Sequence, residues 1–256
     1  MTDEPSGELL VVGLGPGPDP WRTPEASEAL ARASDLIGYK PYLDRCPPRE
    51  DQLRHASDNR VELDRARHAI ALARQGRTVA VVSGGDPGVF AMAAAVFEAI
   101  EADPAARDMS VTVMPGISAM QAASARLGAP LGHDFCAISL SDNLKPWAII
   151  ERRLRAAADG DFVIALYNPA SKSRPAQIFD AFTLLRARKA GETPVAFARA
   201  IGRSDEQITI TTLANADPAL ADMATLVIIG SSQTRLVERP NAMPWIYTPR
   251  SSPDAD

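Results

Sequence analysis

The fold is decided by the stretch VVGLGPGPDPWRTPEA (residues 11–26), where an apolar run meets a glycine-rich turn and a helical pattern follows. A dinucleotide-binding loop has the spacing G-x-G-x-x-G, with a helix directly behind it. Here Gly13, Gly15 and Gly17 follow the spacing G-x-G-x-G instead. Pro16 and the later prolines also remove N–H groups that a pyrophosphate needs. The stretch predicts a loop that closely approaches a ligand other than a phosphate, or alternatively a proline-rich turn without function.

Short apolar runs and longer amphipathic segments alternate along the rest of the chain. This alternation predicts an α/β fold, and adjacent strands near the end predict that the second sheet is mixed. We expect two α/β domains, at 8–132 and 133–250, between flexible tails at 1–7 and 251–256. Strands are predicted at 8–14, 36–39, 78–85, 110–116, 136–142, 162–169, 193–202, 206–214 and 225–232. Helices are predicted at 23–35, 61–76, 88–102, 118–128, 146–160 and 175–191.

The composition narrows the class of protein. With 256 residues, of which 46% are hydrophobic and 23% charged, the chain can bury a core without disulfides or metals. A net charge of −5 argues against nucleic-acid partners and against a polybasic membrane face. No signal peptide and no apolar run of about 18 residues is present, so we expect a cytoplasmic protein. Cys46, Cys136 and the three histidines show no metal-ligand spacing, so we expect no metal.

Three further loops follow predicted strands. In residues 81–90, Gly84 and Gly85 permit close backbone approach, and Asp86 either binds the ribose or amino-acid part of a nucleoside ligand or caps the next helix. Residues 113–123 again run from a strand into a helix. Residues 165–177 contain a compact cationic turn that suits carboxylates. Because loops at the carboxyl ends of strands in one sheet converge on one crevice, we expect the first three loops to meet.

Taken together, these loops resemble the tetrapyrrole methylases, which are S-adenosylmethionine-dependent enzymes. The motifs GLGPG, GGDPGVF, PGISA and LYNP occur in the order of that family, and the resemblance covers about residues 8–230. It implies two α/β domains with a cleft between them and a homodimer. It also implies that S-adenosylmethionine binds in the cleft and leaves as S-adenosylhomocysteine. Carried over by motif, the cofactor contacts are Pro16, Gly84, Gly85, Asp86, Val89, Ser118, Ala119 and Asn168, with looser matches at Ala200 and Thr225.

Three segments resemble the members of the family that methylate precorrin-3B at C17 and contract its ring to precorrin-4 in cobalamin biosynthesis. The segments are GYKPYLD (38–44), PLGHDFCAISLSDNLKPW (130–147) and YNPASKSR (167–174). For acid–base or orienting roles in this reaction we expect Asp142, His133 and Lys145, although a turn aspartate and a histidine at the domain junction are the structural alternatives. For the carboxylates of the tetrapyrrole we expect Lys40, Arg45, Lys172 and Arg174.

Other functions stay open at this point. A sister methylase acting on cobalt-precorrin-3, or on another precorrin carbon, would have similar cofactor loops. An alternative of a different class is an NAD(P)-dependent precorrin reductase, and a third alternative is a cofactor-binding module without catalysis.

Overall fold

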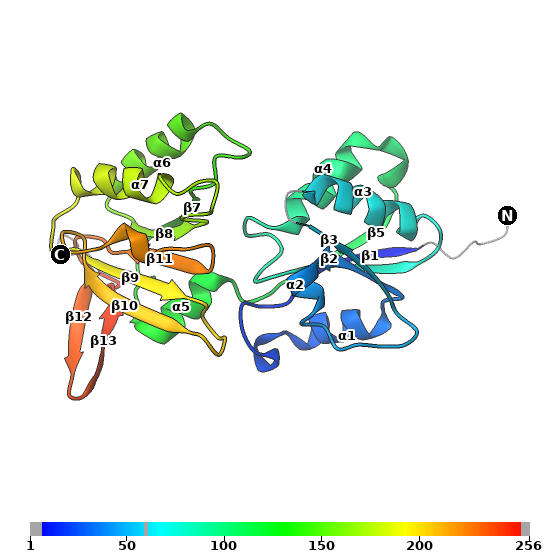
Figure 1. The fold of residues 1–256 in the computed structure, drawn as a ribbon, viewed down its shortest axis with the longest axis horizontal. Helices are drawn as coiled ribbons and strands as arrows, with labels where there is room; N and C mark the ends of the chain where they lie inside the picture. Colours follow the sequence, from blue (N-terminus) through cyan, green and yellow to red (C-terminus); the bar gives the residue numbers. More distant parts are fainter. Residues whose placement is uncertain (1–6, 59–60, 252–256) are drawn as a thin grey trace. The chain divides into compact units, whose positions relative to one another are not determined.

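The computed structural model describes residues 7–58 and 61–251 (Figure 1). The chain forms two compact units, which divide between Ala119 and Met120. This division lies ahead of the boundary expected at 132/133. The helix α5 (Ala119–Leu127) leads directly into β6 (Gly128–Ala129). Because β6 pairs with β13 (Ala242–Tyr247), a strand near the end of the chain, these residues belong to the second unit. Of the expected flexible tails, residues 1–6 and 252–256 lie outside the described residues.

The first unit contains a five-stranded parallel sheet in the order β3-β2-β4-β1-β5. Along β1, an inner strand, Leu9 and Val11 face one buried cluster with α3 and α4, and Leu10 and Val12 face another with α1. Helices therefore cover both faces, as a parallel sheet requires. The strands are β1 (Glu8–Gly13), β2 (Asp35–Tyr39), β3 (Leu53–Ser57), β4 (Thr78–Ser83) and β5 (Ser110–Met114). The helices are η1 (Asp19–Trp21), α1 (Pro24–Arg32), α2 (Lys40–Leu43), α3 (Glu62–Ala73), α4 (Met92–Ala102) and η2 (Pro104–Ala106).

Two helix starts show where the sequence pattern holds and where it does not. The Thr23 hydroxyl accepts a hydrogen bond from the Ala26 N–H at 3.1 Å, as expected for the N-cap of α1. The helix predicted from residue 88 begins only at Met92. Phe90 has φ 53°, a left-handed conformation that interrupts a right-handed helix. Asp86 therefore does not cap α4, which corrects the structural alternative for that residue.

The second unit contains a five-stranded sheet in the order β10-β9-β11-β8-β7. Only the β7–β8 pair is parallel, so the sheet is mixed, as predicted. Its core gathers around Phe182 of α7, whose ring stacks on Phe197 of β9 at 5.9 Å. Its strands are β7 (Phe135–Ser139), β8 (Val163–Tyr167), β9 (Pro194–Arg199), β10 (Gln207–Thr212) and β11 (Thr225–Ile229). Its helices, besides α5, are α6 (Trp147–Asp159), α7 (Gln177–Arg186) and η3 (Pro218–Leu220).

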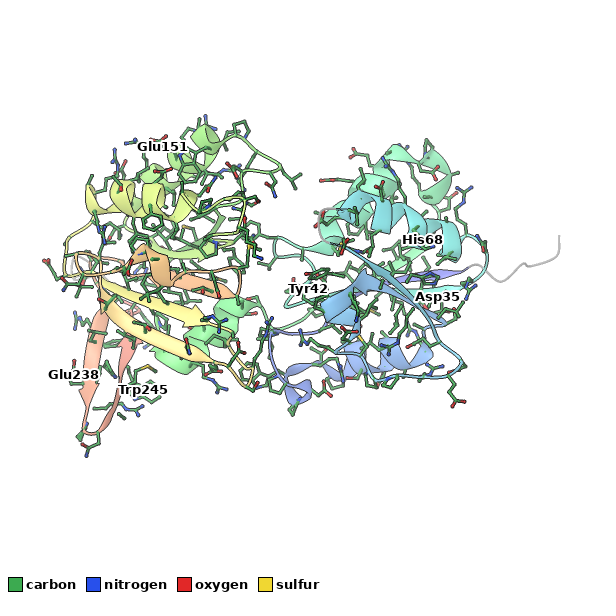
Figure 2. All side chains as sticks on the ribbon, viewed as in Figure 1. Asp35, Tyr42, His68, Glu151, Glu238 and Trp245 are labelled. Carbon is green, nitrogen blue, oxygen red and sulfur yellow. The ribbon has the colours of Figure 1, made fainter. Side chains whose placement is uncertain are left out.

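A three-stranded sheet, β12-β13-β6, completes the second unit, and the sequence pattern did not predict it. β12 (Arg235–Arg239) is largely exposed, β13 (Ala242–Tyr247) is mostly half-buried, and neither carries a clear alternation of apolar and polar residues. Arg239 lies over the ring of Trp245 at 4.1 Å, so part of the hairpin is held by side chains rather than by a core. Figure 2 labels Trp245 and Glu238 on this hairpin. No helix within residues 7–58 and 61–251 is long and apolar enough to span a bilayer.

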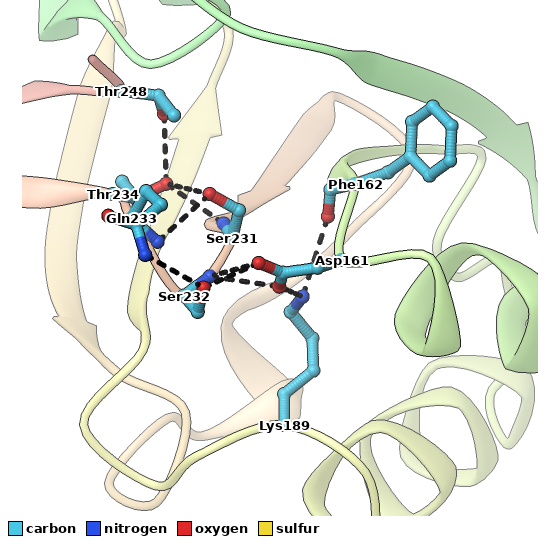
Figure 3. Close-up of polar contacts among 8 residues, drawn as sticks. All are labelled: Asp161, Phe162, Lys189, Ser231, Ser232, Gln233, Thr234 and Thr248. Carbon is cyan, nitrogen blue, oxygen red and sulfur yellow. Dashed lines mark hydrogen bonds and ion pairs between the residues drawn. The ribbon is translucent and has the colours of Figure 1, made fainter. Parts of the chain in front are cut away.

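A polar network fastens the turn between β11 and β12 to the start of β8 (Figure 3). The Asp161 carboxylate accepts hydrogen bonds from Lys189 Nζ at 2.9 Å and from the backbone N–H of Ser232 at 2.9 Å. Burial raises the pKa of Asp161, but these bonds outweigh burial and leave the pKa below its ordinary value. Next to them, Thr234 Oγ1 and Thr248 Oγ1 lie 2.9 Å apart. The network links β8, β12 and the chain after β13.

Asp35, at the start of β2, is a fully buried carboxylate in the first unit (Figure 2). It receives hydrogen bonds from Ser34 Oγ at 2.7 Å, His55 Nε2 at 2.8 Å and Arg77 Nε at 2.6 Å. Burial raises the pKa of Asp35, but the three hydrogen bonds and the charge of Arg77 outweigh burial and leave the pKa below its ordinary value. The ionised carboxylate is therefore the form that the folded unit stabilises.

This cluster predicts a stability that depends on pH. The contribution of Asp35 is present above the pKa of the unfolded carboxyl, about 3.9, and is lost as the pH falls through the lower pKa of the folded protein. Asp35→Asn removes the charge of a buried carboxylate that is hydrogen-bonded to the partly exposed Arg77, so it should cost about 1.5–3 kcal/mol near neutral pH. Urea unfolding at a series of pH values measures this cost, which should shrink in acid. Asp64→Asn, on the exposed face of α3, is the control. If Asp35→Asn lowered the free energy of unfolding equally at every pH, the ionised Asp35 carboxylate would not be the stabilising form.

Candidate functional site

The loops after β1 and β4 are joined by two reciprocal backbone hydrogen bonds. The N–H of Gly15 donates to the carbonyl of Gly85 at 3.1 Å, and the N–H of Gly85 donates to the carbonyl of Gly15 at 3.0 Å. Both residues are left-handed, with φ +67° and +71°, a conformation that favours glycine. Because β1 and β4 are neighbours in the sheet, the two loops form one continuous backbone surface at its carboxyl edge.

Asp86 ties the loop after β5 to this surface. Its Oδ1 accepts a hydrogen bond from the N–H of Gly88 at 2.8 Å, and its Oδ2 accepts one from the N–H of Gly116 at 3.0 Å. A Cβ at Gly116 would lie 2.3 Å from the carbonyl oxygen of Gly85 and 3.1 Å from Gly13. The first three loops therefore meet, as the sequence predicted, and glycine is required where they touch.

The residues expected to contact the cofactor in the first unit all lie in these three loops. Pro16 and Val89 are half-buried, and the hydroxyl-bearing Ser118 is buried. Gly84 lies against Tyr42, since a Cβ at Gly84 would be 2.7 Å from the tyrosine ring. The residues expected at the cofactor therefore lie on three loops that hydrogen bonds join to one another. They are Pro16, Gly84, Gly85, Asp86, Val89, Ser118 and Ala119.

Arg45 has a different environment from the one expected. Its Nη2 donates to the carbonyl oxygens of Leu14, Gly15 and Gly17 at 3.1, 2.9 and 2.9 Å. The guanidinium lies under the first loop, rather than standing free for a substrate carboxylate. Lys40, expected in the same role, is exposed and pairs with Asp44 at 2.9 Å, one turn along.

In the second unit, three residues expected at the cofactor lie at one edge of the sheet. Asn168 follows β8 with φ 50°, and its Nδ2 donates to Ser139 Oγ at 2.9 Å. Ala200 follows β9 with φ 51°. Thr225 begins β11 opposite the last residue of β9, and its hydroxyl donates to Asp222 Oδ1 at 2.7 Å. Left-handed residues other than glycine cost about 1–3 kcal/mol and concentrate at functional sites.

Arg174 and Asp142 are brought together at the same edge of the second sheet. Arg174 is only 6% exposed, and its Nη1 lies 3.4 Å from the carbonyl oxygen of Asn168. Its Nε lies 4.0 Å from Asp142 Oδ1. Gln177 Nε2 donates to Asp142 Oδ2 at 2.9 Å, a contact that no sequence signal indicated. Of the two cations of the predicted turn, Lys172 is exposed and Arg174 is buried.

The other two acid–base candidates lie in separate loops. His133 lies between β6 and β7, where its Nδ1 accepts the N–H of Asp134 at 2.7 Å. Lys145 lies just ahead of α6, and burial, together with the charge of Arg153, lowers its pKa. Asp142 and Arg174 therefore share a contact, whereas His133 and Lys145 stay individual predictions.

Neither cysteine is a reactive thiol of the site. Burial raises the pKa of the Cys136 thiol to about 11, and it also raises that of Cys46. In the described part of the chain, no group of three or more His, Cys, Asp or Glu residues is placed to hold a metal ion. An open apolar hollow of about 410 Å³ lies beside β13 and contains none of the predicted site residues.

Residues 8–217 match the family of Tetrapyrrole (Corrin/Porphyrin) Methylases, and the chain belongs to that family of methyltransferases. A relative from Sinorhizobium sp, named precorrin-3B C(17)-methyltransferase, is 58% identical over 96% of this chain and 97% of its own. The crystal structure of the methyltransferase CobJ matches with a TM-score of 0.91 and 52% identity, over 95% of this chain and 100% of that chain. A probable cobalt-factor III C(17)-methyltransferase from Salmonella typhimurium is 42% identical over 94% of this chain and 99% of its own. The expected tetrapyrrole methylase fold is thus confirmed.

The contact between the three loops predicts a large effect for Gly116→Ala. The new methyl group would overlap the Gly85 carbonyl, so the loops must separate, at a cost of about 1–3 kcal/mol. Thermal unfolding should show a Tm lower by about 2–4 °C for each kcal/mol. The matched control is Gly88→Ala, whose Cβ would meet only the Asp86 side chain, at 3.2 Å. Equal Tm values for the two variants would show that the loops do not meet at Gly116.

Proposed function

We propose that this protein is the S-adenosylmethionine-dependent methyltransferase that methylates precorrin-3B at C17 and contracts its ring to precorrin-4 in cobalamin biosynthesis. The observation that carries the proposal is the 58% identity to the Sinorhizobium precorrin-3B C(17)-methyltransferase, which extends over nearly the whole of both chains. Membership of the methylase family favours methyl transfer over the NAD(P)-dependent reductase and over a module without catalysis.

The first three loops suit S-adenosylmethionine better than a phosphate-rich cofactor. Gly84 and Gly116 let the loops pack closely against Tyr42 and the Gly85 carbonyl, Gly85 leaves room where a Cβ would lie, and Pro16 has no N–H to offer a phosphate. When bound, S-adenosylmethionine supplies an electrophilic methyl group on a sulfonium. The residues that would hold it are Pro16, Gly84, Gly85, Asp86, Val89, Ser118 and Ala119 in the first unit, with Asn168, Ala200 and Thr225 in the second.

The protein's own contribution to methyl transfer is positioning and exclusion of water. A nucleophilic carbon of the tetrapyrrole needs no covalent enzyme intermediate, and correct placement alone reaches effective molarities of about 10⁵–10⁸ M. Ring contraction adds a need to hold and move protons. For this we propose Asp142, held by Gln177 beside Arg174, with His133 and Lys145 as further candidates. The lowered pKa of Lys145 favours its neutral amine more than that of an ordinary lysine.

The carboxylates of the tetrapyrrole predict a role for the exposed Lys172. Lys172→Ala should raise the KM for the tetrapyrrole about two- to fivefold, because an exposed ion pair contributes about 0.2–1 kcal/mol. It should also reduce the rise of KM with salt, since screening acts on that charge. Steady-state kinetics at several salt concentrations measure both effects. Arg188→Ala, on the exposed surface after α7, is the control. An unchanged KM for Lys172→Ala would remove this residue from the substrate site.

The product of the reaction tests the proposed function directly. Incubation with precorrin-3B and S-adenosylmethionine carrying a ¹³C-methyl group should yield precorrin-4 with the label on C17, as seen by mass spectrometry and NMR. A label on another carbon, or methylation without ring contraction, would assign the protein to a sister activity. Calorimetry with S-adenosylhomocysteine and with NADP provides a second criterion, since binding of NADP alone would contradict a methyltransferase.

The similarity to the Salmonella protein supports a second candidate substrate. That relative is named for cobalt-factor III, so the same C17 chemistry on a cobalt-containing ring is the alternative to cobalt-free precorrin-3B. Competition between the two substrates in one assay, followed by product analysis, decides between them. A cytoplasmic location and a homodimer also stay predictions, and sedimentation of the purified protein measures the assembly.

A further inference from the structure

We propose that Arg45 is a positioning residue, which holds the first loop in the shape that receives S-adenosylmethionine, rather than a contact for the tetrapyrrole. The inference rests on the proposed function, because it concerns the cofactor side of the same site. It gives a role to a guanidinium that the sequence had assigned to substrate carboxylates.

The first step of the argument is the way Arg45 meets the loop. One nitrogen, Nη2, lies 3.1 Å from the carbonyl oxygen of Leu14 and 2.9 Å from those of Gly15 and Gly17. Two hydrogens on this nitrogen are shared among three acceptors, so the bonds are partly bifurcated and hold three peptides at one point. A charged donor makes each bond stronger than a neutral one would.

The second step concerns the opposite side of the same peptides. In a trans peptide the C=O and N–H point in opposite directions, and the described residues contain no cis bond. The peptides after Gly15 and Gly17 end in Pro16 and Pro18, which have no N–H. With the carbonyls turned toward Arg45, these two peptides present neither a donor nor an acceptor on their outer side. Such a surface offers no donor to a phosphate, whereas it can pack against the apolar, methyl-bearing part of S-adenosylmethionine.

The third step is the anchoring of Arg45 itself. Arg54, on β3, donates to the carbonyl oxygens of Leu43 at 2.9 Å, Cys46 at 3.0 Å and Pro47 at 2.7 Å. These carbonyls flank Arg45 on both sides, so its backbone is fixed to the sheet. Tyr42, in the same segment, packs against Gly84 of the second loop. The segment from α2 to Pro47 therefore contacts both loops that Gly15 and Gly85 join.

Two variants separate the positioning role from a substrate contact. Arg45→Met keeps the length of the side chain and removes its donors, and Arg45→Lys keeps the charge but is too short to reach the three carbonyls. Both should weaken S-adenosylhomocysteine binding about tenfold or more in calorimetry, and raise the KM for S-adenosylmethionine without raising that for the tetrapyrrole. Arg67→Met, on the exposed face of α3, is the matched control and should bind like wild type.

A readout without any ligand accompanies the binding data. In the ligand-free protein, hydrogen exchange at the Gly15 and Gly85 amides should be at least about tenfold faster in both Arg45 variants than in wild type or Arg67→Met. Wild-type exchange with unchanged S-adenosylhomocysteine affinity would overturn the inference, as would a rise confined to the KM for the tetrapyrrole. If wild type itself does not bind S-adenosylhomocysteine, the proposed function fails, and the exchange rates alone decide the role of Arg45.

Discussion

The reciprocal hydrogen bonds between Gly15 and Gly85 are the constraint on which the rest of the site depends. They join loops from neighbouring parallel strands, whose carboxyl ends necessarily lie at one edge of the sheet. Each bond needs its glycine in a left-handed conformation, which a side chain makes costly. Asp86 then ties the third loop to this joined pair, and Gly116 lies directly against Gly85.

The chemistry of this arrangement differs from that of a phosphate-binding loop. A phosphate loop gathers backbone N–H groups at the start of a helix, and its ligand neutralises their partial positive charge. Here the helix begins at Pro24, after a short 3₁₀ turn, and prolines replace N–H groups along the loop. Carbonyl oxygens are turned toward the half-buried guanidinium of Arg45 instead. A methyl-bearing cation is the kind of ligand that a surface without exposed N–H donors accepts, in line with the proposed function.

The second unit holds its candidate residues in a different way. Asn168 and Ala200 adopt left-handed backbone at the ends of β8 and β9, and Thr225 lies at the start of the antiparallel strand between them. Arg174 and Asp142 are then set by side-chain contacts with Gln177 and with backbone carbonyls. The polar network around Asp161 fixes the opposite end of β8, so the strand that carries Asn168 is held at both ends.

The sequence by itself determined the α/β alternation and the order of most elements, the mixed character of the second sheet, the Thr23 cap and the meeting of the first three loops. These features follow from the periodicity of apolar residues and from local turn chemistry, which nearby residues specify. Only the tertiary structure decided the division of the chain at the start of α5, the late start of α4, the helix α2 and the strand β3 at the edge of the first sheet. The same holds for the small sheet of β12, β13 and β6 and for the places of Arg45 and Gln177. Arg45 reaches carbonyls about thirty residues away, and a contact over such a separation leaves no periodic trace in the sequence.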